Sequence, residues 1–267
     1  MIETWLNSTE RAPNPYTQFR LLDVEEPAGL PEPVRDYVSE LLRESRFDSG
    51  FLTAMAGVLG WERVRDSLAS GAAPGSTSTR RGDFGEVLIT ALLEEVHGYV
   101  VPVRKLRFKV TRDQLLTGTD ALAIRINNEG RVTEVCFVES KLRTATRGEV
   151  DRTLAVTGCQ QLKKDYDSKL PDILQFIAQR LYETEDELFA AFGEYMRTRA
   201  DTTDLDTFCL GLVWDREEWE EQILQNLEDH TDVVPRLVVH AVRINNLGTV
   251  SDDMFARVGV LEVLDDE

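Results

Sequence analysis

The chain has 267 residues, 42% of them hydrophobic, which suits one medium-sized globular domain or a core domain with a helical appendage. No apolar run approaches the roughly 20 residues of a transmembrane helix, and the amino terminus lacks the basic start and apolar stretch of a signal peptide. Three widely spaced cysteines without a CxxC pair argue against a disulfide framework or zinc knuckle and favour a cytoplasmic location without membrane attachment.

The charge is unevenly distributed along the chain. The formal net charge of −18 is a poor overall match to a polyanionic partner. Residues 99–148, however, hold ten Arg or Lys against five Asp or Glu, a local charge of +5, which leaves −23 for the remainder. This basic segment is equally compatible with a phosphate-binding surface and with a solvated strand edge.

The N-terminal part is predicted to be helical after an irregular, proline-rich start. Residues 34–45 carry apolar side chains at helical spacing, and a second helix is expected over residues 50–69. The small, polar stretch GAAPGSTST, residues 71–79, is the best candidate linker. We therefore predict an N-terminal helical segment, residues 1–70, and a second domain, residues 80–267.

The second part alternates helices and strands. A helix is predicted over 83–96, and two strands joined by a turn at 127–130 form a predicted antiparallel hairpin, 120–126 and 131–142. Short β-branched stretches follow the first helix at 99–103 and 106–110, and the remaining predictions are strands at 207–214 and 236–244 and helices at 148–165, 172–199 and 216–229. This order predicts an α/β fold whose mixed central sheet is flanked by helices.

Two D/E-x-K triplets occur, and such triplets arise by chance in a chain with 48 acidic residues. Asp167-Ser168-Lys169 lies in a polar stretch without a preceding strand. Glu139-Ser140-Lys141 instead closes a predicted strand, and the two-residue period of a strand places Glu139 and Lys141 on one face. That arrangement would let a carboxylate hold a divalent ion while an ammonium group faces the same phosphate.

Two further acids complete the candidate site. Asp120 opens the first strand of the hairpin, so a tight turn would bring it near Glu139, where two carboxylates repel unless a cation accompanies them. Glu86 is the only charged residue in the apolar helical run from Phe84 to Leu93. A lone carboxylate there is costly unless it is paired, protonated or near a metal, although the first-turn helix dipole would also favour it.

Glu86 in GDFGE, Asp120 in GTDA and Glu139-Ser140-Lys141 together resemble the PD-(D/E)XK nuclease superfamily. The predicted order of helix, three strands, helix and strand matches its restriction-endonuclease-like common core, with Thr119 where proline stands in the superfamily's name. Residues from about 80 to 215 resemble more narrowly the HamA family, the nuclease component of the Hachiman antiphage defence system, at the GDFGE, GTDA and ESK positions.

The resemblance implies roles for these residues. Asp120 and Glu139 would bind Mg²⁺ or Mn²⁺ with the Ser140 carbonyl as a further ligand, and Glu86 would contact the ion through water or form a second metal position. Lys141 would position or deprotonate the attacking water. Candidate phosphate contacts on the following helix, which suit a solvated helix face equally well, are Gln160, Gln161 and Lys163.

The HamA resemblance also implies DNA as substrate and a superfamily 2 DNA helicase subunit, HamB-like, as partner. Candidate docking surfaces are residues 34–69 and the acidic segment 215–230, either of which also suits ordinary packing or a solvated face. Two alternative functions remain: a free-standing restriction-type endonuclease, and a catalytically inactive nuclease-fold subunit that binds DNA or serves as a scaffold.

Overall fold

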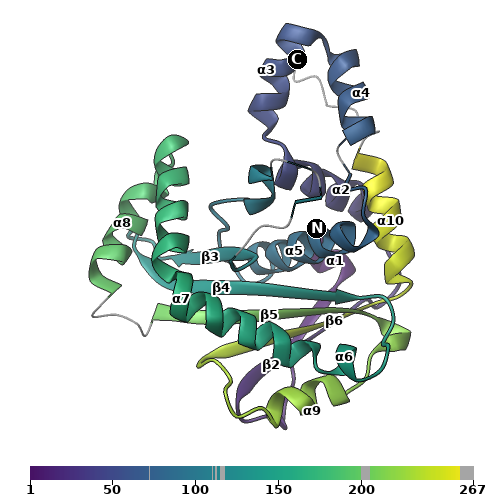
Figure 1. The fold of residues 1–267 in the computed structure, drawn as a ribbon, viewed down its shortest axis with the longest axis vertical. Helices are drawn as coiled ribbons and strands as arrows, with labels where there is room; N and C mark the ends of the chain where they lie inside the picture. The colour runs from purple at the N-terminus through teal and green to yellow at the C-terminus, as the bar shows by residue number, and fades with distance from the viewer. Residues whose placement is uncertain (72, 110, 112, 115–117, 200–204, 259–267) are drawn as a thin grey trace.

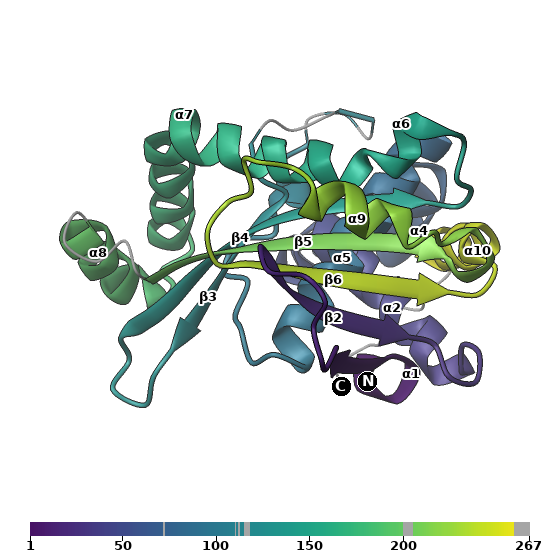
Figure 2. The ribbon, with the colours of Figure 1, turned by 90° about the horizontal axis from the view of Figure 1, so that it is seen from below.

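Six strands form one mixed sheet in the order β1-β2-β6-β5-β4-β3 (Figures 1 and 2). The computed structural model describes residues 1–71, 73–109, 111, 113–114, 118–199 and 205–258. The four central strands run parallel, and an antiparallel strand closes each edge. The strands are β1 (Asn7–Glu10), β2 (Phe19–Glu25), β3 (Ala121–Ile126), β4 (Val132–Arg143), β5 (Asp206–Asp215) and β6 (Leu237–Ile244). The predicted α/β class with a mixed sheet is confirmed.

Helices cover both faces of the sheet because its strands are apolar on both faces. One face packs against α1 (Ile2–Trp5), α2 (Glu32–Arg46), α5 (Thr77–Glu95) and α10 (Leu247–Val258). The other packs against α7 (Leu154–Glu183), α8 (Leu188–Thr198) and α9 (Gln222–Glu228), with the short α6 (Glu149–Arg152) beside them. Within β4, Cys136 and Val138 face α5, whereas Val135 and Phe137 face α7.

The N-terminal region contributes strands as well as helices. The prediction of an irregular start was wrong, because β1 and β2 both lie within the first 30 residues. Strand β2 pairs in parallel with β6 over seven residues, from Phe19 opposite Leu237 to Glu25 opposite Arg243. Strands from residues 1–70 and from residues 80–267 therefore belong to one sheet. The predicted linker, residues 71–79, does not divide this sheet into two; its residue 72 lies outside the described residues.

Residues 50–69 form two helices where one was predicted. Helix α3 (Ser49–Leu59) ends at Gly60, whose φ of 83° is readily adopted only by glycine, and α4 (Trp61–Gly71) follows. The two helices pack on each other and project away from the sheet (Figure 1). Phe51, Val58 and Leu59 on α3 are exposed large apolar residues. The predicted linker then overlaps the start of α5 at Thr77.

The predicted hairpin of β3 and β4 is confirmed, with Ala121 opposite Val138. The β-branched stretches 99–103 and 106–110 form no regular strand within the described residues. Val100 makes an isolated bridge to Ile124, and Lys105–Phe108 forms the 3-10 helix η1; residue 110 lies outside the described part of the chain. Two strands therefore stand where the predicted order had three.

The predicted helices 148–165, 172–199 and 216–229 have other bounds in the structure, and one further helix was not predicted. Residues 154–183 are one helix through Pro171, and α7 changes direction along its length, as expected of an interior proline (Figure 2). The acidic stretch 216–229 divides into η4 (Arg216–Glu218) and the shorter α9. Helix α10 was not predicted. Across the described residues, the helices are too short or too polar to cross a bilayer.

Helix α5 approaches the sheet closely at Gly211 of β5. A Cβ atom at this position would lie 2.3 Å from Cγ1 of Ile89, well inside contact distance. Absence of a side chain at residue 211 therefore determines how near α5, which carries Glu86, lies to the central strands.

Candidate active site

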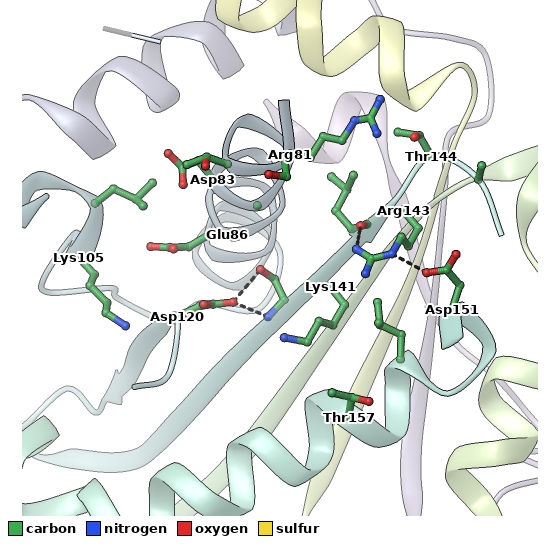
Figure 3. Close-up of a pocket in the computed structure, with 18 of the residues that line it drawn as sticks. Arg81, Asp83, Glu86, Lys105, Asp120, Lys141, Arg143, Thr144, Asp151 and Thr157 are labelled. Carbon is green, nitrogen blue, oxygen red and sulfur yellow. Dashed lines mark hydrogen bonds and ion pairs between the residues drawn. The ribbon is translucent and has the colours of Figure 1, made fainter. Parts of the chain in front are cut away.

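A cavity of about 790 Å³ opens between the start of α5, the end of β4 and the start of α7 (Figure 3). Its charged lining is more basic than acidic. The cationic side chains are Arg81, Lys105, Lys109, Lys141, Arg143 and Arg147. The acidic ones are Asp83, Glu86, Asp120 and Asp151. The cavity thus concentrates positive charge in a protein whose net charge is −18.

Asp120 is held at the edge of the cavity by the neighbouring strand. Its Oδ2 accepts hydrogen bonds from the backbone N–H of Ser140 at 2.7 Å and from the Ser140 hydroxyl at 2.9 Å. The Asp120 N–H donates to the carbonyl of Val138 at 2.9 Å, continuing the β3–β4 ladder. Within the described residues Oδ1 accepts no hydrogen bond and is available to a ligand.

Glu139 and Lys141 lie on the same face of β4, as the strand period predicted, and their side chains form an ion pair. Lys141 reaches the cavity, whereas Glu139 is only 4% exposed and does not line it. Burial, and next the negative charge of Asp120, raise the pKa of Glu139 to about 8. The Lys141 ammonium acts in the opposite direction by favouring the carboxylate.

Glu86 projects from α5 towards the same space as Asp120, with Lys105 nearby (Figure 3). Burial and then the charge of Asp120 raise its pKa well above the ordinary value for glutamate, while Lys105 favours the charged form. Asp120 is therefore near enough to raise the pKa values of both glutamates, after burial, which is the larger cause. The structure brings together all five predicted site residues: Glu86, Asp120, Glu139, Ser140 and Lys141.

The donor set suits one hard divalent cation bound largely through water. No group of three His, Cys, Asp or Glu side chains within the described residues is arranged to hold a metal alone. Mg²⁺ commonly uses one or two carboxylates and keeps waters and substrate oxygens in its remaining positions. Asp120 and Glu86 would meet that lower requirement, and a cation between them would offset the burial and the Asp120 charge that together raise the pKa of Glu86.

Several cavity residues were not singled out as site residues from the sequence. The Lys105 ammonium donates to the carbonyls of Gly118 at 3.2 Å and Thr119 at 2.6 Å, so it stands directly beside Asp120. Asp83, one helical turn before Glu86, is buried and accepts hydrogen bonds from Lys109 at 2.6 Å and from Arg46 of α2 at 2.7 Å. In the sequence, only the excess of basic residues in segment 99–148 pointed to Lys105 and Lys109 as candidate phosphate-binding residues.

The opposite end of the cavity is also basic. Arg143 donates to Asp151 at 2.8 Å (Figure 3), and the Arg147 N–H donates to the same carboxylate at 2.7 Å. Burial raises the pKa of Asp151, but the hydrogen bonds from Arg143 and the Arg147 N–H outweigh it, so the pKa lies below the ordinary value for aspartate. Asp151 thereby fixes two arginine-bearing segments along the cavity wall.

The α7 residues considered as phosphate contacts do not line this cavity. Gln161 donates to the buried Asp165 at 2.7 Å, and Lys163 forms ion pairs with Asp167 and Asp232. Thr157 and Leu154 of α7 line the cavity in their place. The second triplet, Asp167-Ser168-Lys169, lies within α7, so the prediction that it does not close a strand is confirmed.

Comparison with known proteins places the chain in a family. The family model for HamA matches residues 3–258, from α1 to the end of α10. The chain is also similar to the Hachiman protein HamA of Bacillus cereus, with 33% identity over 116 residues. That alignment covers 43% of this chain and 38% of the relative's length. Since the family match spans nearly every described element of the fold, the chain belongs to the HamA family.

Proposed function

We propose that this chain is a metal-dependent nuclease of the PD-(D/E)XK type that acts on DNA in antiphage defence. The observation that carries the proposal is the convergence of Glu86, Asp120 and Lys141 on one basic cavity, with Glu139 paired to Lys141 behind it. The similarity of this chain to a relative named as a Hachiman protein supports the defence role.

Each residue has a distinct task in this proposal. Asp120 and Glu86 would hold Mg²⁺ or Mn²⁺, with Glu139 and the Ser140 carbonyl as further ligand candidates. The ion would supply Lewis acidity at a phosphate oxygen. Lys141 donates a hydrogen bond to the phosphate or the attacking water, which places positive charge where negative charge develops.

The outer cations of the cavity bind the flanking phosphates. Arg143 stands on one side of Lys141 and Lys105 on the other (Figure 3), and Arg147 also lines the cavity, so a strand crossing it meets positive charge along its path. Lys and Arg contacts to phosphates supply most sequence-independent affinity for DNA. Because the rest of the chain is acidic, the free protein would bind DNA weakly and depend on a partner for recruitment.

A cleavage assay tests the proposal. Purified protein is incubated with DNA in Mg²⁺ or Mn²⁺, alone and with a HamB-like superfamily 2 helicase subunit. We expect Asp120→Asn and Lys141→Met each to lower the cleavage rate about 100-fold or more, since each removes charge from the reacting centre. Asp167→Asn, in the helical triplet, is the matched control and should cut at the wild-type rate.

The outcomes separate the competing functions. Cleavage at one sequence only would favour a free-standing restriction-type endonuclease. Absence of metal-dependent cleavage under every condition would contradict the nuclease proposal and leave the inactive DNA-binding or scaffold subunit. Cleavage that survives both substitutions would remove the proposed site.

We also propose that the helicase partner contacts α3, since Phe51, Val58 and Leu59 are exposed there and this helix projects from the sheet. Replacing all three with serine is expected to abolish co-purification with the helicase without changing the melting temperature. Complex formation at wild-type yield would contradict this assignment. The acidic segment 215–230 is the alternative surface, because η4 and α9 carry several exposed or half-exposed acids.

A further inference from the structure

A second cavity, of about 350 Å³, adjoins the proposed catalytic cavity. It lies on the α7 side of the sheet, between η1, the segment from Gly118 to Leu122, and the middle of α7. Asp120 and Lys105 line both cavities, so the two spaces meet at the proposed metal-binding carboxylate.

The walls of this second cavity are mainly apolar. Ile173, Phe176 and Ile177 lie on one face of α7 at helical spacing. Phe108 of η1 stands edge-on to Phe176, with ring centroids 5.3 Å apart. Both rings remain partly exposed. Val103 and Leu122 complete the apolar lining.

The charged side chains of the second cavity differ in how many hydrogen-bond or ion-pair partners they have. Lys169 pairs with the buried Asp165 at 2.7 Å, and Asp172 adds a carboxylate. Lys105 uses two of its donors on the carbonyls of Gly118 and Thr119. An ammonium group has three donors, so Lys105 keeps one for a ligand at the junction of the two cavities.

We propose that the second cavity is a nucleobase subsite, which takes the base of the nucleotide adjoining the scissile phosphodiester. This inference rests on the proposed nuclease function. A strand whose phosphate lies against Asp120 and Lys105 has its attached base within reach of the apolar space beside them. A base offers a flat apolar face to Phe176 and Ile173, and polar edges that Asp172 and Lys169 are able to bond.

The division of chemistry between the two cavities favours this occupant. The first is lined by six cationic side chains, which suit phosphates, whereas the second is lined mainly by aliphatic and aromatic side chains, which suit a base. Enzymes that handle a base outside the stack hold it between apolar or aromatic side chains. The subsite would favour DNA that is single-stranded or locally unpaired at the cut, since a paired base cannot leave its partner without cost.

The test scans a missing base along the substrate. Oligonucleotides with one abasic nucleotide at each successive position are cut by the wild-type protein in Mn²⁺. We expect a loss of about tenfold in kcat/KM when the base adjoining the scissile bond is absent, and little change elsewhere. Phe176→Ala should cut intact and abasic substrates at one reduced rate, because the wall that the base contacts is gone.

Two variants guard against misfolding and non-specific effects. Phe176→Leu keeps an apolar side chain and should retain part of the abasic sensitivity. Phe189→Ala changes a partly exposed phenylalanine on α8 that does not line this cavity and should behave as wild type. Equal cleavage of all abasic substrates by the wild-type protein, or full sensitivity in Phe176→Ala, would overturn the subsite.

A binding measurement separates this inference from the nuclease proposal. The Lys141→Met protein is mixed with oligonucleotides carrying 2-aminopurine at successive positions, and quenching is expected at one position only and is lost in Phe176→Ala. Position-specific quenching without any cleavage by wild type would support the subsite and contradict the nuclease. Cleavage with uniform quenching would support the nuclease and contradict the subsite.

Discussion

Buried ionisable side chains cluster where the proposed chemistry requires them. Glu139 is almost fully buried, which raises its pKa, and the ammonium of Lys141 partly offsets that effect by favouring the carboxylate. Asp83 is likewise buried between Arg46 and Lys109. A buried charge with a partner on another element ties the site to the fold, so the same residues serve both chemistry and architecture.

His240 of β6 gives a prediction for the pH dependence of stability. Burial, and next the positive charges of His97 and Arg20, lower its pKa to about 3 from 6.5. Below pH of about 6.5 the unfolded chain binds a proton here that the folded chain does not. Stability therefore falls as pH drops from about 6.5 towards about 3, by at most about 1.4 kcal/mol per pH unit.

Urea unfolding at pH 6.5 and pH 4.5 measures this effect. We expect His240→Leu to show a smaller loss of unfolding free energy over that interval than the wild-type protein, because the titrating group is absent. The ring of His97 lies edge-on to His240 at 5.0 Å and contributes in the same direction, so some dependence remains. Equal losses in the two proteins would contradict the assignment.

At the scale of elements, local pattern was a good guide to strands and a weaker guide to helix ends. Continuous apolar runs identified β4, β5 and β6, because strands at the centre of a sheet are buried on both faces. Helix α7 crosses Pro171 because side chains such as Leu162 and Leu174 are buried on both sides of the proline. Packing over many residues outweighs one lost hydrogen bond.

The ion cluster around Asp83 joins α2, α5 and the segment after η1. Asp83→Ala would leave the cations of Arg46 and Lys109 buried without this shared carboxylate, and we expect a loss of about 3–5 kcal/mol in unfolding free energy. Asp83→Asn keeps the shape and one acceptor and should cost less. Chemical denaturation of both variants measures the difference. An unchanged unfolding free energy in Asp83→Ala would disprove the stabilising role of this carboxylate.

The close packing of α5 on β5 depends on the missing side chain at Gly211. Because an added Cβ would overlap Ile89, Gly211→Ala should lower the unfolding free energy by about 1–3 kcal/mol through overpacking. The paired variant Gly211→Ala with Ile89→Ala relieves the overlap, so its loss of unfolding free energy should be smaller than the sum of the two single losses. Additive losses in the double variant would show that the two residues do not interact.

At the scale of the whole molecule, the sheet joins distant parts of the chain. β2, from the first 30 residues, lies beside β6, from near residue 240, and both are parallel to β5 and β4 (Figure 2). Ile2 and Trp5 of α1 are buried in the same core as α5. The N-terminal residues are thus structural parts of the sheet that carries the candidate site.

Removal of residues 1–30 is therefore expected to prevent cooperative folding. It takes away β1 and β2 and leaves the apolar edge of β6 without a partner. Thermal melts followed by circular dichroism, together with size-exclusion chromatography, should show no sharp transition and aggregated protein. The serine replacements on α3, which change exposed side chains only, provide the control, and a monomeric truncated protein with a sharp melt would contradict this view.

The sequence was sufficient for the α/β class, the β3–β4 hairpin and the approach of Asp120, Glu139 and Lys141. These features depend on neighbours a few residues apart, on strand period and on turn chemistry, all of which are local. Glu86 was found for a related reason, since one acid in an apolar helix is visible without knowledge of its surroundings.

Other features required the folded chain. The place of β1 and β2 in the sheet, the contact of Lys105 with the carbonyls beside Asp120, and the cavity bounded by Phe108 and Phe176 all join residues far apart in sequence. Pairing over such separations leaves no periodic trace in the sequence, because each partner is also compatible with solvent or another neighbour. Tertiary packing selects among these partners, and so it set the shape of the site although local pattern named its central residues.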